Sequence, residues 1–278
     1  MNAKLKYDIE NIYNIPTIAP MLRKLLVLIE DPAVSMNELS KFILKDPSLT
    51  ARVIKFVNSP IFKSRFSHPI TSVNQAMLML GINSVKGILL GVMVSNYMDK
   101  TMEGLWLHSA GCAEASKIIA ELTLNVDLIE DITVSAILHD IGKVILNTKY
   151  PQKYRAVLLN SKNGETYILE EEINIFEVTH ADVGSWLAHK WNFPIVLTET
   201  IKYHHHPTMS KNAKIHCSIV NLADCLIKAF GFGYSGDNLI PLLDPHVFEI
   251  LKINETILNE IIKEVYNEIS DEEAFNLD

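Results

Sequence analysis

The chain has 278 residues, of which 48% are hydrophobic, and a formal net charge of −8. This length and composition are typical of a folded protein with a large apolar core in one or two domains. The negative charge, without any cluster of Lys and Arg, argues against binding to nucleic acid or to anionic membranes. Three cysteines without CxxC spacing, and an N-terminus without an apolar signal segment, predict a cytoplasmic protein with free thiols.

The first hundred residues show helical periodicity and nothing that looks catalytic. Ser35, followed three residues later by Glu38, fits a capping box that starts a helix. Asp46-Pro47 fits the N-cap and first position of the next helix. Gly81 is expected to separate two further helices. Helices are predicted over residues 21–29, 36–44, 47–57, 72–80 and 83–98.

Gly87 and Gly91 form a G-x-x-x-G pattern in an apolar stretch. In a membrane this spacing favours helix dimerisation. The stretch around it is short and contains Lys86, so we do not expect it to span a bilayer. Close packing of two helices in a protein core is the predicted use.

The most informative stretch is Ala136–Lys143, which contains His139-Asp140 among apolar residues. We predict one helical segment here, with Asp131 as its N-cap. A buried His and Asp need a partner, which is either a divalent metal or a hydrogen bond between the two at a helix end. Lys143 lies one turn after His139, where it could hold an anionic group, and Gly142 would let a neighbour approach closely.

Other predicted helices carry His and Asp residues on their apolar faces. Two ions bridged by Asp140 would use seven such residues, which favours the metal over the hydrogen-bonded pair. His189 and His206 fall outside the apolar faces and are expected at the surface. The candidate metal ligands are His108, His139, Asp140, His180, His204, His205 and Asp224.

Three other features are predicted to have no part in the site. Residues 231–236 match the G-x-G-x-x-G dinucleotide pattern but follow a helix, so we expect a flexible loop. The acidic run at 170–172 is expected to be a solvated helix face. Residues 1–14 are taken as an N-terminal extension and residues 270–278 as a frayed acidic tail.

Several short motifs follow one another in the order seen in the HDOD family. The chain resembles this family from about residue 15 to 260. HDOD proteins are bacterial signalling and regulatory proteins related to the HD phosphohydrolases. The motifs are Ile15-Pro16, Asp46-Pro47-Ser48-Leu49, Asn58-Ser59, Ala76, Leu80-Gly81, Trp106-Leu107-His108-Ser109, Leu138–Lys143, His180–Gly184, Trp191–Pro194 and His204–Pro207.

The resemblance implies an all-α fold in which an N-terminal helical lobe, residues 15–100, packs on an HD-like helical lobe, residues 101–269. It implies that His108, His139, Asp140 and Asp224 match the first-metal ligands of the HD superfamily. It also implies that His180, His204 and His205 match the further histidines of its two-metal members. A site of this composition suits Fe, Mn, Ni or Zn.

The chain departs from the catalytic HD-GYP relatives at two positions. Pro207-Thr208-Met209-Ser210 stands where those enzymes have a Gly-Tyr-Pro element, and Gly104 stands where they can place a carboxylate. We therefore expect a regulatory or ligand-sensing module, with a signalling protein or a small phosphorylated ligand as its partner. The alternative is a metal-dependent phosphohydrolase in which Asp140 holds metal and Lys143 steadies a phosphate.

Overall fold

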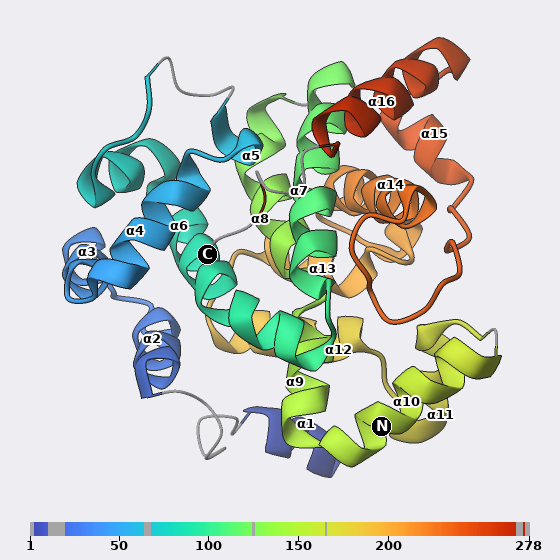
Figure 1. Cartoon of the computed structure of the whole chain (residues 1–278), viewed down its shortest axis with the longest axis horizontal. Helices are drawn as coiled ribbons and strands as arrows, with labels where there is room; N and C mark the ends of the chain where they lie inside the picture. The colour runs from blue at the N-terminus through green and yellow to red at the C-terminus, as the bar shows by residue number, and fades with distance from the viewer. Residues whose placement is uncertain are drawn as a thin grey trace.

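The computed structural model describes residues 3–10, 20–63, 68–123, 126–164, 166–270 and 275. Within these ranges the ordered elements are helices, which confirms the predicted all-α fold (Figure 1). The α-helices are α1 (Ala3–Glu10), α2 (Pro20–Glu30), α3 (Met36–Leu44), α4 (Pro47–Val57), α5 (Pro60–Lys63), α6 (Val73–Thr101), α7 (Leu105–Leu122), α8 (Ile129–Leu138), α9 (Ile141–Lys149), α10 (Pro151–Gly164), α11 (Ile168–Phe176), α12 (His180–Lys190), α13 (Ile195–Tyr203), α14 (Lys214–Phe230), α15 (His246–Leu251) and α16 (Glu255–Glu268).

The N-terminal helices begin where their capping residues predict. At α3, the Glu38 backbone N–H donates to Ser35 Oγ at 3.3 Å and the Ser35 N–H donates to Glu38 Oε2 at 2.9 Å, which completes the capping box. At α4, Asp46 Oδ1 accepts from the backbone N–H groups of Ser48 and Leu49. Local side-chain chemistry therefore sets both helix starts.

Helix α6 joins the two halves of the fold. It packs against α2, α3 and α4 and also against α7, α8 and α9 (Figure 1). Gly81 interrupts it with φ 74° and ψ 166°, as the sequence indicates. The described apolar residues form one core that runs through both halves. The predicted division into lobes 15–100 and 101–269 stays a prediction.

The glycines of α6 allow close approach to α8. A side chain at Gly87 would overlap Val134, and one at Gly91 would come within 2.8 Å of Ile137. This confirms close helix packing at the G-x-x-x-G pattern. The expectation that the segment is too short to span a bilayer is wrong for length alone, because Val73–Ser95 is long and apolar enough. However, 67% of the most apolar stretch of 18 residues in this helix is buried inside the fold, as in the core helix of a soluble protein.

Described residues near both ends of the chain pack into the fold, which the sequence did not suggest. The supposed N-terminal extension contains α1, whose Leu5 and Ile9 are buried and which packs against α12. In the acidic tail, Phe275 is 2% exposed and its carbonyl accepts a hydrogen bond from Trp106 Nε1 at 2.9 Å. The other tail residues after 270, and residues 11–19 with Ile15-Pro16, lie outside the described part of the chain.

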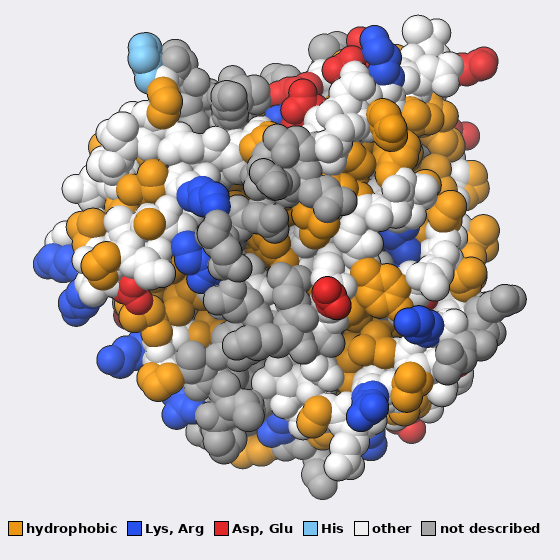
Figure 2. Space-filling model, in the orientation of Figure 1, with side chains coloured by type: hydrophobic (Ala, Val, Ile, Leu, Met, Phe, Trp, Pro, Cys, Tyr) orange, Lys and Arg blue, Asp and Glu red, His pale blue; other side chains and the backbone are white. Residues whose placement is uncertain are grey.

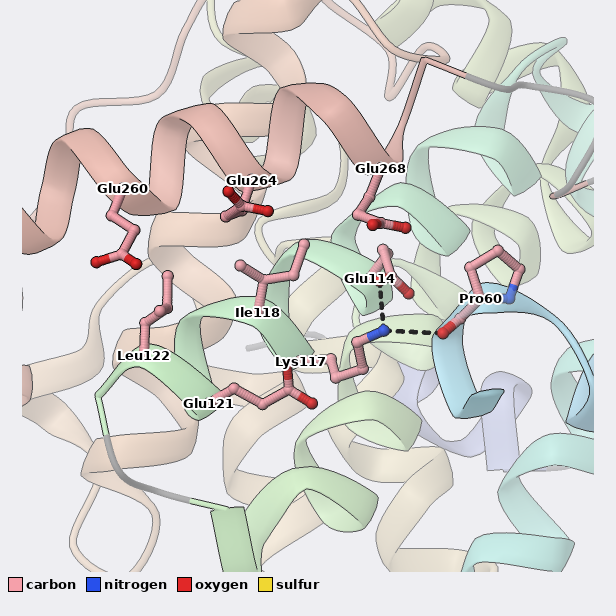
Figure 3. Close-up of a pocket in the computed structure, with 9 residues that line it drawn as sticks. All are labelled: Pro60, Glu114, Lys117, Ile118, Glu121, Leu122, Glu260, Glu264 and Glu268. Carbon is pink, nitrogen blue, oxygen red and sulfur yellow. Dashed lines mark hydrogen bonds and ion pairs between the residues drawn. The ribbon is translucent and has the colours of Figure 1, made fainter. Parts of the chain in front are cut away.

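An acidic groove of about 600 Å³ lies between α7 and α16 (Figure 3). Acidic side chains gather at the end of the molecule where α16 lies (Figure 2). Within the groove, Lys117 Nζ lies 2.5 Å from Glu114 Oε1 and donates to the carbonyl of Pro60 at 2.8 Å. Its walls contain none of the predicted metal ligands. The groove is lined by Pro60, Glu114, Lys117, Ile118, Glu121, Leu122, Glu260, Glu264 and Glu268.

Candidate metal centre

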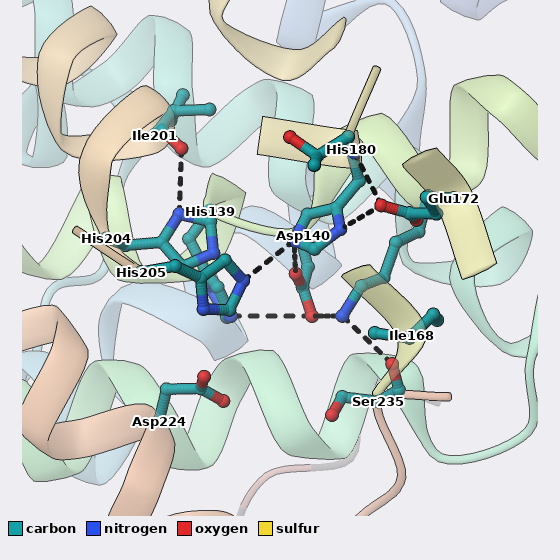
Figure 4. A network of polar contacts seen from close by, with 12 residues as sticks. His139, Asp140, Ile168, Glu172, His180, Ile201, His204, His205, Asp224 and Ser235 are labelled. Carbon is teal, nitrogen blue, oxygen red and sulfur yellow. Dashed lines mark hydrogen bonds and ion pairs between the residues drawn. The ribbon is translucent and has the colours of Figure 1, made fainter. Parts of the chain in front are cut away.

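The predicted metal ligands come from five helices or helix ends and face one part of the interior, where they form three groups of candidate ligands. Figure 4 labels all of them except His108. His108 comes from α7, His180 is the first residue of α12, and Asp224 lies on α14. His204 and His205 follow the end of α13. His139 and Asp140 lie between α8 and α9, so the prediction of one continuous helix through this motif is wrong. The break lets the two side chains leave the helical register and enter the centre.

His139 and His204 show the hydrogen-bonding pattern of metal ligands. The Nδ1–H of His139 donates to the carbonyl of Ala136 at 2.6 Å, and that of His204 donates to the carbonyl of Ile201 at 2.7 Å. In a neutral ring this leaves Nε2 with a free lone pair. Both Nε2 atoms are buried and have no hydrogen-bond partner among the residues that the structure describes. Such orphaned nitrogens are costly without a partner, and a divalent metal fits the position.

Asp140 lies between three imidazoles and the ammonium of Lys143. Its Oδ1 is 3.1 Å from His180 Nε2, and its Oδ2 is 3.4 Å from His139 Nε2 and 3.7 Å from His108 Nε2. His180 Nε2 is also 3.2 Å from His205 Nε2. Three nitrogens and both carboxylate oxygens therefore face a common space, as expected for a carboxylate that bridges two ions or ligates one.

The other side of the centre is formed by α7 and α14. Asp224 Oδ1 lies 3.2 Å from His108 Nε2, and Cys112 Sγ lies 3.6 Å from the same nitrogen. Cys112 was not among the predicted ligands, although it follows His108 by four residues and therefore shares its helix face. His108, Cys112, His139 and Asp224 offer ligand atoms within 4.8 Å of one another. Two further groups meet the same criterion: His139, Asp140 and His204, and His180, His204 and His205.

Lys143 is not positioned as the sequence suggested. Its ammonium donates to Asp140 Oδ2 at 2.6 Å and to the carbonyl of Ser235 at 2.9 Å. The residue is 3% exposed. The side chain therefore neutralises Asp140 and attaches the loop after α14, whereas the sequence predicted a cation directed toward a bound anion.

The loop at residues 231–236 is attached to the centre, so the prediction of a flexible loop is wrong. The backbone N–H of Tyr234 donates to the carbonyl of Gly104 at 3.0 Å. A side chain at Gly233 would overlap the backbone of His108, and φ is 69° at Gly233. Glycine is required here because of this close approach and the left-handed backbone. With Lys143 bound to Ser235, the loop covers the site on this side.

The prediction that the acidic run at 170–172 is a solvated face is wrong for Glu171 and Glu172, which are both buried. The side chain of Glu172 is fully buried. Its Oε2 lies 2.8 Å from His180 Nδ1, and its Oε1 accepts from the hydroxyl of Tyr154 at 3.0 Å. A signal was present, because Ile168, Glu172 and Phe176 recur at intervals of four and share one helix face.

The pKa values of Asp140 and of three histidines in the centre are shifted by burial and by neighbouring charges. Burial alone would raise the pKa of Asp140, but His139, Lys143 and His180 together hold it well below its usual range. Burial lowers the pKa of His139, and burial with neighbouring imidazoles lowers that of His204 and His205 strongly. Asp140 is therefore held in its ionised form and His139, His204 and His205 in their neutral forms, which are the protonation states that metal binding requires.

The exposed fractions of the histidines follow the sequence prediction, except that His205 was expected to be buried and is only partly buried. His108, His139, His180 and His204 are buried, and His205 is partly buried. His189 and His206 are exposed. His205 also lines a cavity of about 370 Å³, whose walls include Lys202. Of the seven predicted ligands, His205 is therefore the one that links the buried centre to this cavity.

A model of the HDOD domain family matches residues 15–207. This chain belongs to the HDOD domain family. The match includes six of the predicted ligands and ends before Asp224. The chain is also 24% identical over 225 residues to an uncharacterised protein of Treponema pallidum (strain Nichols). That alignment covers 79% of this chain and 43% of the relative, so the chain spans less than half of the relative's length.

Solved structures of similar fold come from several bacteria. An HDOD domain protein of unknown function from Geobacter sulfurreducens has a TM-score of 0.70 at 21% identity, covering 98% of this chain and 99% of that one. A protein proposed to act in signal transduction, from Marinobacter aquaeolei VT8, has a TM-score of 0.67 at 17% identity, covering 96% and 59%. A proposed metal-dependent phosphohydrolase from Shewanella amazonensis SB2B has a TM-score of 0.60 at 15% identity, covering 98% and 96%. These likenesses establish the shared fold.

Proposed function

We propose that this HDOD protein is a regulatory module whose histidine centre holds one or two divalent transition-metal ions in a structural or ligand-sensing role. The ligands would be His108, His139, Asp140, His180, His204, His205 and Asp224. Fe, Mn, Ni and Zn all suit this mixture of imidazole and carboxylate. Its partner would be a signalling protein or a small phosphorylated ligand, and its action would not require turnover.

The observation that supports this proposal most directly is the burial and hydrogen bonding of Lys143. Its ammonium is bonded to Asp140 and to the carbonyl of Ser235, in a side chain that is 3% exposed. A phosphate-binding lysine needs free donors that a ligand can reach. Here one donor is bonded to Asp140, another holds the covering loop through Ser235, and the ammonium is buried, which favours a centre that stabilises the fold over one that admits a phosphoester.

A metal-dependent phosphohydrolase is the second candidate. The cavity beside His205 favours it, because Lys202 in its wall could attract a phosphate near the centre. A bound divalent metal would supply Lewis-acid polarisation of a phosphoryl oxygen and activation of water. Of the chain's own groups, Asp140 and the histidines would hold the metal, and Lys202 would orient the anion.

Metal analysis of the purified protein, followed by a turnover assay on nucleotides and phosphodiesters with Mn²⁺ or Fe²⁺, tests the two candidates. We expect bound metal and no hydrolysis above background. A hydrolytic rate that is lost in both Asp140→Ala and Lys143→Ala would make the protein an enzyme and overturn the proposal. Lys202→Ala would then distinguish anion binding in the cavity from a supporting effect of Lys143.

A further inference from the structure

Glu172 places a buried carboxylate behind one of the proposed metal ligands (Figure 4). Its Oε2 accepts from the backbone N–H of His180 at 2.7 Å and lies 2.8 Å from the ring Nδ1 of the same residue. Its Oε1 accepts from the hydroxyl of Tyr154 at 3.0 Å. A carboxylate without solvent needs such donors. Two of the three belong to His180.

These bonds determine which way the imidazole faces. Because Nδ1–H donates to Glu172, Nε2 is directed into the centre, 3.1 Å from Asp140 Oδ1 and 3.2 Å from His205 Nε2. The corresponding Nδ1 atoms of His139 and His204 donate to neutral backbone carbonyls. His180 alone of these three has an ionisable acceptor. A hydrogen bond to a carboxylate is stronger than one to a carbonyl and makes the other ring nitrogen a better electron donor.

We infer that Glu172 is a positioning residue for His180, resting on the metal site proposed above. Its carboxylate fixes the orientation and tautomer of the ring, and its charge increases the affinity of Nε2 for metal. The competing explanation is that Glu172 only caps α12, since it also binds the N–H of the first residue of that helix. However, Thr179 and Asp182 already provide α12 with a complete capping box.

The test compares Glu172→Gln with the wild type in metal binding. Glutamine keeps the shape and one acceptor oxygen but removes the charge. Both proteins are stripped with chelator and titrated with Zn²⁺ in competition with a chromophoric chelator, and with Co²⁺ by visible absorption. We expect Glu172→Gln to bind both ions about 10- to 100-fold more weakly. We also expect an altered Co²⁺ spectrum, and a Tm for the metal-free protein close to that of wild type.

Two neighbouring residues provide matched controls. Glu171→Gln removes the same charge one residue earlier, at a carboxylate bonded to Asn160 and Thr166. Tyr154→Phe removes the one donor to Glu172 that is not on His180. Both should retain the metal affinity of wild type. If Glu172→Gln does not fold, Glu172→Asp keeps the charge but is too short to reach both donors of His180, and should also bind metal more weakly.

The outcomes separate this inference from the proposal on which it rests. If wild type binds neither Zn²⁺ nor Co²⁺, the metal site fails and the assignment of Glu172 fails with it. If wild type binds metal and Glu172→Gln binds it equally well, only the assignment is overturned. A lower Tm of metal-free Glu172→Gln with unchanged metal affinity would also overturn it, because that is the result of a helix cap.

Discussion

Helix α7 carries polar side chains on two faces, and the two faces differ in how their charges are balanced. On one face, His108 and Cys112 contact the histidine centre. On the other, Glu114 and Lys117 line the acidic groove. Glu114 and His108 are both almost completely buried. Burial alone therefore does not decide what a polar residue on this helix can do.

The carboxylates on the two faces differ in the direction in which their pKa values are shifted. Asp140 and Asp224 lose solvent on burial, but surrounding imidazoles, and Lys143 at Asp140, hold both pKa values well below the usual range. Burial raises the pKa of Glu114, and its single ion pair with Lys117 does not reverse the effect. The centre is arranged to keep its carboxylates ionised, and the groove is not. That contrast supports assigning the metal to the centre.

Removing the central carboxylate is the strongest test of this contrast. Asp140→Ala leaves Lys143 buried without its anionic partner, and breaking a buried pair in this way costs about 3–5 kcal/mol. Metal that binds only the folded state adds to the stability of wild type. We therefore expect Asp140→Ala to lower the Tm and the metal content. Chelation should lower the Tm of wild type and have no effect on the variant. A variant with unchanged metal content would contradict the assignment of Asp140 as a ligand.

Gly142→Ala should have the next largest effect on stability and metal binding, because it acts on the backbone of His180, a proposed metal ligand. A side chain at this position would overlap the backbone carbonyl of His180. Moving α12 to relieve such a clash costs about 1–3 kcal/mol and displaces the His180 ring. We expect a lower Tm together with weaker metal binding by titration. Gly184→Ala is the control: its new methyl group would meet the side chains of Ile201 and Ile141 and not the backbone of a ligand, and should lower stability with less effect on the metal. Equal metal affinity in Gly142→Ala and wild type would contradict this account.

The pH dependence of metal binding should follow His180. Burial by itself lowers the pKa of this ring, but Glu172 and Asp140 raise it above the ordinary value of 6.5. A metal that binds Nε2 must displace the proton there, so affinity should fall as pH falls below the pKa, by about tenfold per pH unit for one proton. In the metal-free protein the raised pKa of His180 contributes stability at low pH that is lost as pH rises, whereas the lowered pKa values of His139, His204 and His205 cost stability as pH falls. Metal affinity that stays constant between pH 8 and pH 6 would contradict the prediction.

Glu114→Gln gives the smallest predicted effect and tests the groove. A carboxyl group whose pKa is raised by folding favours the native state at low pH, and this contribution is lost as pH rises through the folded pKa. Wild type should therefore gain stability relative to Glu114→Gln as pH falls from 7 to 5. Thermal unfolding at the two pH values measures the difference. An unchanged difference in Tm would show that Glu114 is no harder to ionise than an exposed glutamate.

The sequence by itself determined most of the helices, though not α1 or the break between α8 and α9, and most of the residues that meet at the centre. Ser35 and Asp46 start α3 and α4 through bonds to residues two or three positions away. Helical phase also identified which histidines are buried and which, like His189 and His206, are exposed. These features depend on chemistry within a few residues of the chain, and a periodic pattern records it directly.

The tertiary structure decided which distant residues the buried polar side chains bond to. Lys143 bonds to Ser235, which is 92 residues away in sequence, and Glu172 is buried because α10 and α12 supply Tyr154 and His180 around it. The break between α8 and α9 places His139 and Asp140 in the centre, against the expectation of one helix. Helical phase gives the face on which a side chain lies, but it carries no information about which distant residue will face it, because that depends on how the helices pack.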